Sequence, residues 1–229
     1  MRRNISICFL GIDGSGKSTL SNLLYDELKR KNYNVSYVWW LDGENTCLRR
    51  LLRNIFGAKR SINSEMPSTK SDRSDLRQFI KYFYLSIVLL DYLRFGLIKT
   101  RCPVFSREMD VIIFDRFYYD TVLALSSEFN LGIKYKNLIL RIYDKFFRQP
   151  DLIFVVDIPP ELSFERKKED YESLENARAL YANYKDLYSE LEHLIPGTIC
   201  IIDNTSELEI AKVSMIKNVI SILDGDNHC

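Results

Sequence analysis

The chain has 229 residues, 46% hydrophobic and 28% charged, so it is long enough to bury a full core and is expected to form a single domain, 1–229. Its 32 Lys and Arg residues nearly cancel its 31 Asp and Glu residues, which excludes the broad basic surface of a nucleic-acid-binding protein. Five cysteines without a Cys-x-x-Cys pair, and an N-terminus without an apolar signal core, predict a reduced, cytoplasmic protein.

The first predicted elements flank a glycine-rich motif. An apolar run at 5–10 predicts a strand, and leucines at helical spacing in 20–31 predict a helix. Between them, residues 11–19 read GIDGSGKST, which matches the G-x-x-x-x-G-K-[ST] pattern without a mismatch. The order strand, loop and helix is typical of a phosphate-binding loop, or P-loop.

Each residue type in this loop has a task in binding a nucleoside triphosphate. Glycines permit positive φ and let N–H groups turn toward phosphate oxygens, while the following helix directs its positive dipole end at them. Lys17 is expected to bridge the β- and γ-phosphates, and Ser18 to place its hydroxyl on Mg²⁺. The predicted binding residues are Gly11, Asp13, Gly14, Ser15, Gly16, Lys17, Ser18 and Thr19.

The segment that follows contains the only candidate for a membrane span. Before it, the patterns predict a strand at 34–40, a short basic helix at 47–56 and a mobile, Ser-rich connection at 58–74. The apolar run 79–98 is interrupted by charged residues, among them Asp91 and Arg94, at depths where a membrane disfavours charge. It is therefore predicted to be a long buried helix, with no membrane partner.

Strands and helices alternate in the second half of the chain. The predicted strands are 111–114, 152–157 and 198–202, and the predicted helices are 121–128, 135–147, 174–194 and 207–223, with a further helix from Pro160 into the charged residues 165–170. Such alternation predicts an α/β fold with a parallel sheet and helices on both faces. Ligands of such sheets gather at the carboxyl ends of the strands.

Asp115 and Arg116 follow the buried strand 111–114. A buried Asp beside an Arg is costly unless each charge is paired. We expect Asp115 to hold Mg²⁺ through water and Arg116 to bind the phosphate of the acceptor; the alternative is a structural ion pair. Tyr119 is expected either to line the acceptor pocket or to pack in the core.

A basic cluster at 166–168 lies after the strand 152–157. It is either a solvated basic face or part of a lid, about 166–172, that closes cations over phosphates.

Three segments together, GIDGSGKSTL, FDRFYYD and PDLIFVVDIPPELSFERKK, resemble the thymidylate kinase family of P-loop nucleoside monophosphate kinases. The resemblance implies a P-loop NTPase-type three-layer fold with a five-stranded parallel sheet, and homodimers formed helix to helix. It also implies transfer of the γ-phosphoryl group of ATP to a nucleoside monophosphate, with dTMP the first candidate.

The resemblance also assigns roles by position. It implies that Asp13 faces the sugar of the acceptor and Arg116 its phosphate, while Asp115 assists the metal. Arg166 would meet the ATP phosphates or the adenine, and the loop after residue 202 would border the base of ATP. The residues predicted to carry the reaction are Lys17, Asp115, Arg116 and Arg166.

The chain departs from the family pattern where the acceptor base is read. WWLDG, at 39–43, stands in place of an R-x-P-G-like segment. The position of the thymine-reading Arg is taken by Asp91 in one register, while counting back from Arg116 brings Arg94 close. A nucleoside or another small metabolite is therefore an alternative acceptor. An NTP-dependent switch is a further alternative, although no N-K-x-D motif for guanine is present.

Overall fold

The computed structural model describes residues 4–39, 86, 89, 90, 93, 94, 109–129, 131–147, 149–194, 199–205 and 208–224. Within these residues, five strands form one parallel sheet in the order β2-β3-β1-β4-β5. The strands are β1 (Ile5–Leu10), β2 (Val35–Trp39), β3 (Val111–Asp115), β4 (Leu152–Asp157) and β5 (Ile199–Asp203). The predicted helix at 47–56 and the connection at 58–74 lie outside the described residues.

The central strands are buried on both faces. Every residue of β1 and β3 is buried, which explains why their sequences are continuous apolar runs without alternation. β1 lies between β3 and β4, and Phe9 of β1 pairs with Asp115 of β3. The loops that follow these three strands therefore emerge side by side at the carboxyl edge of the sheet.

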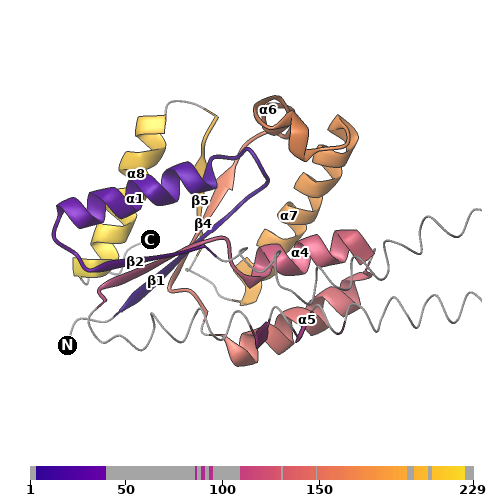
Figure 1. Ribbon diagram of the computed structural model, residues 1–229, viewed down its shortest axis with the longest axis horizontal. Helices are drawn as coiled ribbons and strands as arrows, with labels where there is room; N and C mark the ends of the chain where they lie inside the picture. Colours follow the sequence, from indigo (N-terminus) through magenta and orange to yellow (C-terminus); the bar gives the residue numbers. More distant parts are fainter. Residues whose placement is uncertain are drawn as a thin grey trace, which may run out of the picture.

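Helices cover both faces of the sheet, as Figure 1 shows. They are α1 (Lys17–Arg30), α4 (Tyr118–Phe129), α5 (Ile133–Phe146), α6 (Pro160–Arg166), the short 3-10 helix η2 (Lys168–Asp170), α7 (Leu174–Leu194) and α8 (Leu208–Asp224). α1 and α8 pack with the sheet in one apolar core, and α4, α5 and α7 pack with it in the other. The predicted three-layer α/β fold is confirmed.

The predicted helix at 79–98 is described at five positions, all of them helical: Ser86, Leu89, Leu90, Leu93 and Arg94. Leu89 and Leu93 pack against the core of α4, α5 and α7, whereas Leu90 is 64% exposed. The hydroxyl of Tyr143 on α5 donates to the Leu89 carbonyl at 3.0 Å. None of the helices among the described residues is long and apolar enough to cross a membrane.

α4 begins at Tyr118, earlier than the predicted start at 121. The Asp120 carboxylate accepts the Phe117 N–H at 3.2 Å, which satisfies a donor that the first turn leaves open. Tyr118 and Tyr119 of this first turn are buried, and Tyr119 is only 1% exposed. Of the two readings of Tyr119, the structure supports packing in the core, because its ring contacts those of Phe117 and Tyr118 there.

Candidate active site

The loop between β1 and α1 has the backbone geometry that binds phosphate. Gly14 and Gly16 have φ of 79° and 93°, a region that residues with a Cβ rarely adopt. A Cβ on Gly16 would lie 2.4 Å from Nδ2 of Asn204, so the close approach of the two segments requires glycine there. Because Gly16 immediately precedes α1 and has no side chain to cap it, the N–H groups of the first turn are available to an anion.

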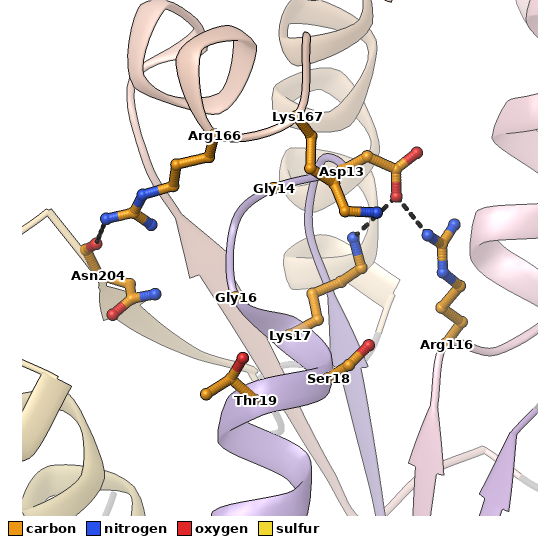
Figure 2. A pocket seen from close by; sticks show the side chains of 10 residues that line it. All are labelled: Asp13, Gly14, Gly16, Lys17, Ser18, Thr19, Arg116, Arg166, Lys167 and Asn204. Atoms are coloured by element: carbon orange, nitrogen blue, oxygen red, sulfur yellow. Dashed lines mark hydrogen bonds and ion pairs between the residues drawn. The ribbon is translucent and has the colours of Figure 1, made fainter. Parts of the chain in front are cut away.

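Four regions that the sequence predicted separately meet around one cavity of about 440 Å³. Its lining comes from the P-loop, the end of β3, the turn after α6 and the loop after β5 (Figure 2). The lining residues are Asp13, Gly14, Gly16, Lys17, Ser18, Thr19, Arg116, Arg166, Lys167 and Asn204. Most of the predicted triphosphate-binding residues are therefore at the cavity.

Lys17 is a buried cation held against backbone carbonyls. Its Nζ donates to the carbonyls of Gly11 at 2.6 Å and Ile12 at 2.8 Å, and the side chain is only 4% exposed. Burial, together with the nearby charge of Arg116, holds the pKa of Lys17 below its ordinary value. A polyphosphate beside this ammonium group would add negative charge and favour its protonated form.

Asp13 joins the P-loop to the end of β3. Its Oδ1 accepts a hydrogen bond from the guanidinium of Arg116 and lies 3.6 Å from Nζ of Lys17 (Figure 2). Burial opposes ionisation of Asp13, but the charges of Lys17 and Arg116 outweigh it and hold its pKa below the ordinary value. One carboxylate thus holds two cations, from two strand ends, at the same cavity.

Arg116 reaches this position through an unusual backbone conformation. Its φ is 68°, in the left-handed region that costs a residue with a Cβ about 1 kcal/mol. Although burial disfavours the charge of its guanidinium, Asp13 and Asp120 raise its pKa above the ordinary value. Arg116 therefore stays charged beside the cavity, at the position predicted for a phosphate ligand.

Asp115 lies behind the cavity and does not line it. It is 3% exposed, and its Oδ2 accepts a hydrogen bond from the Tyr37 hydroxyl at 2.8 Å. Its Oδ1 is also buried, yet accepts no hydrogen bond from the part of the chain that the structure describes. A buried carboxylate oxygen without a donor, at the end of β3, fits a water ligand of Mg²⁺. Ser18, the second predicted metal residue, lines the cavity.

Of the three cations of the predicted lid, Arg166 and Lys167 line the cavity, and they point in different directions. Figure 2 shows Arg166 extending toward Asn204, and Nη2 of Arg166 donates a hydrogen bond to the Asn204 carbonyl at 3.2 Å. Lys167 extends toward Asp13. Lys167 also lies 2.8 Å from Oδ2 of Asp170, a hydrogen bond that raises the pKa of Lys167. The cavity thus receives one lid cation on the Asn204 side and one on the Asp13 side.

Three polar side chains that the sequence did not single out support the P-loop backbone. Nδ2 of Asn204 donates to the Ser15 carbonyl at 2.7 Å. The hydroxyls of Tyr171 and Ser163 both donate to the Asp13 carbonyl, the former at 2.6 Å. The position of Asn204 directly after the last strand was a signal for it. No sequence signal marked Ser163 and Tyr171, because both donate to a backbone carbonyl, which every residue has.

Of the two predicted base-reading residues, the structure describes only Arg94. Arg94 is exposed and does not line the cavity, and Asp91 lies outside the described residues. Gly11 and Ser15 do not line it either, but their carbonyls hold Lys17 and Asn204.

Comparisons with known proteins find similarity to thymidylate kinases. A family model described as thymidylate kinase matches residues 104–215. A probable thymidylate kinase of Methanobrevibacter smithii is 26% identical, over 82% of this chain and 83% of the relative. The thymidylate kinase of Plasmodium falciparum is 25% identical, over 94% and 90% of the two chains.

The fold is also found in a solved structure. The crystal structure of thymidylate kinase from Ehrlichia chaffeensis is similar with a TM-score of 0.56 and 20% identity, over 94% of this chain and 98% of the other. The likeness extends along nearly the whole of both chains and agrees with the resemblance seen in the motifs. The chain is therefore similar to thymidylate kinases, in sequence to the relatives named above and in fold to the solved structure.

Proposed function

We propose that this chain is an ATP-dependent nucleotide kinase that transfers the γ-phosphoryl group of ATP to a nucleoside monophosphate. dTMP is the first candidate acceptor, with dTDP and ADP as products. The observation that carries the proposal is the pair of cations, Lys17 and Arg116, that one carboxylate, Asp13, holds at a single cavity. The printed names of the relatives, thymidylate kinases, support the same reaction.

The donor is assigned to the P-loop side of the cavity. Backbone N–H groups at the start of α1, with Lys17, Ser18 and Thr19, are arranged to bind the phosphates of ATP. Lys17 exchanges its contacts with the carbonyls of Gly11 and Ile12 for phosphate oxygens. Arg166, bound to the loop after β5, is placed toward the adenine end of the donor.

The acceptor is assigned to the Arg116 side. A guanidinium group recognises a phosphate through charge and two parallel hydrogen bonds, a match that a neutral hydroxyl does not provide. Asp13 alone does not use all five N–H donors of Arg116. The anionic acceptor, a monophosphate, therefore fits better than an unphosphorylated nucleoside.

Ser18 and Asp115 are the residues that would hold Mg²⁺, Asp115 through water from its free Oδ1. When bound, the ion neutralises charge on the donor phosphates. The protein's own residues then position two anions and stabilise the charge that develops between them. Lys17 acts from the donor side, Arg116 from the acceptor side, and Lys167 from the end of α6.

We further propose that residues 166–172 act as a lid on a single P-loop kinase domain. The hydroxyls of Ser163 and Tyr171 bind the same P-loop carbonyl, so both ends of this segment are anchored while Lys167, 47% exposed, remains accessible to a ligand. Rearrangement between these anchors would bring cations to the phosphates without moving the sheet.

We also propose a cytoplasmic homodimer that associates through the helix within 79–98. Leu90 supports this, because it is exposed on that helix while Leu89 and Leu93 pack on the core. The free thiol of Cys8, buried in β1, is consistent with a reducing compartment. Light scattering at tens of micromolar should give about twice the chain mass of 26.9 kDa, and a monomer would contradict the dimer.

The proposed function is tested by ADP release from ATP and Mg²⁺ with a panel of nucleoside monophosphates, nucleosides and sugar phosphates. We expect monophosphates to stimulate release and nucleosides not to. Stimulation by nucleosides alone would overturn the acceptor assignment, and release without any acceptor would favour the NTP-dependent switch. Within the panel, a kcat/KM for dTMP well above that for dCMP agrees with base reading by Arg94, and the reverse agrees with Asp91.

A further inference from the structure

Tyr37 of β2 makes a contact with Asp115 that no motif accounts for. The two strands are parallel neighbours in which Tyr37 pairs with Ile113, so Asp115 lies diagonally across from Tyr37 on the same face of the sheet. The Tyr37 hydroxyl spans this diagonal and donates to Oδ2 of Asp115 at 2.8 Å.

This hydrogen bond determines which oxygen of Asp115 remains free. A carboxylate turns about its terminal bond unless one oxygen is held. Oδ2 is held by Tyr37, while Oδ1 is buried and accepts no hydrogen bond within the described ranges. Leaving a buried carboxylate oxygen without a donor is costly, so a fixed free oxygen points to a ligand that the fold is built to receive.

The same hydroxyl is linked to the first turns of α1. It lies 3.0 Å from Oγ of Ser21, and Oγ of Ser21 lies 3.1 Å from the carbonyl of Ser18. The ring of Tyr37 is held edge-on against Tyr25, with centroids 6.0 Å apart. A short chain of contacts therefore runs from Asp115 through Tyr37 and Ser21 to Ser18, and it joins the two residues assigned to Mg²⁺.

We propose that Tyr37 is a positioning residue for Mg²⁺, which fixes the Asp115 carboxylate so that Oδ1 faces the metal's water shell at a set distance from Ser18. The inference rests on the proposed function, because it needs ATP and Mg²⁺ at the P-loop. Outer partners of metal ligands orient those ligands, and their loss typically lowers metal affinity about 10- to 100-fold. Since Asp115 acts through water, we expect an effect near the lower end of that range.

The test is the metal dependence of ATP binding, measured without acceptor by equilibrium dialysis in Mg²⁺ and in excess EDTA. Tyr37→Phe removes only the hydroxyl and keeps the ring. We expect this variant to lose about tenfold in the ratio of the two ATP affinities, with the affinity in EDTA unchanged. Tyr25→Phe, on the ring that packs against Tyr37, is the matched control and should keep the wild-type ratio.

A double-mutant cycle with Asp115→Asn shows whether the effect passes through the carboxylate. In that background Tyr37→Phe should change the ratio no further, and Mn²⁺ paramagnetic resonance should report weaker ion binding in Tyr37→Phe with ATP bound. If thermal unfolding shows that Tyr37→Phe does not fold, Ser21→Ala, which removes the other partner of the hydroxyl, should lower the ratio in the same direction.

Three results would overturn the inference. They are a wild-type ratio in Tyr37→Phe, an equal loss of ATP affinity with and without metal, and a loss that persists in the Asp115→Asn background. A wild-type protein whose ATP binding does not depend on Mg²⁺ would instead contradict the proposed function. The two failures are therefore distinguishable.

Discussion

Arg116→Ala should damage use of the acceptor far more than binding of ATP. The substitution removes a charged group that lines the cavity beside Asp13. Hydrogen bonds to charged groups contribute about 1.5–3 kcal/mol net, which corresponds to a loss of roughly 10- to 150-fold in kcat/KM for the acceptor. This loss in kcat/KM is a lower limit, because Arg116 also stabilises the charge that develops in the transition state.

The fold should tolerate this change. Arg116 is already 23% exposed, and Asp13 keeps Lys17 at 3.6 Å as a partner. The left-handed φ of 68° disfavours Ala as it disfavours Arg, so no additional backbone strain is introduced. Thermal unfolding of the variant should therefore stay near that of the wild type.

The assay measures kcat and KM for dTMP at saturating ATP, and the dissociation constant of ATP without acceptor. Arg178→Ala is the matched control, because it removes an exposed arginine that is paired with Glu161 and does not line the cavity. If ATP affinity collapses in Arg116→Ala while the acceptor KM is unchanged, the donor and acceptor sites have been assigned in reverse.

Two further predictions concern the P-loop and the lid. Gly16→Ala places a Cβ 2.4 Å from Nδ2 of Asn204, at a φ of 93°. It should therefore lower the free energy of unfolding by at least about 1–2 kcal/mol and weaken ATP binding. An unchanged urea midpoint and an unchanged ATP affinity would contradict this geometry. Lys167→Ala should mainly lower kcat and Arg166→Ala mainly raise the KM for ATP, because they extend toward Asp13 and Asn204 respectively. Steady-state kinetics check this pair, and the opposite pattern would mean that their roles are exchanged.

The sequence predicted the sheet and the P-loop because both depend on local patterns. Buried parallel strands such as β1 and β3 are continuous apolar runs, which few other elements of that length resemble. The P-loop needs glycine where φ is positive and Lys at a fixed spacing, so its sequence carries its geometry. Arg116 could be assigned to the site because it forms a charged pair with Asp115 at the end of a buried strand. A buried strand end rarely carries such a pair without a function.

The rest of the site depends on contacts between segments far apart in the chain. Asn204 donates to a carbonyl of Ser15, 189 positions earlier, and Tyr171 donates to a carbonyl of Asp13, 158 positions earlier. Every residue offers a carbonyl, so no pattern marks these partners in advance. The two readings of Tyr119 stayed open for a different reason. An aromatic ring at the start of a helix suits a pocket wall and a core equally well until the neighbouring helices are placed.

Phosphoryl transfer at this site is tested most directly by following the products of ATP, Mg²⁺ and dTMP by chromatography with the wild type and with Lys17→Ala. We expect ADP and dTDP to form in equal amounts with the wild type. In Lys17→Ala, which still folds, the rate should fall by about a hundredfold or more, because the transferred phosphoryl group loses its buried cation. Wild-type turnover by Lys17→Ala, or ADP formed without any nucleoside diphosphate from any monophosphate tried, would contradict phosphoryl transfer at this site.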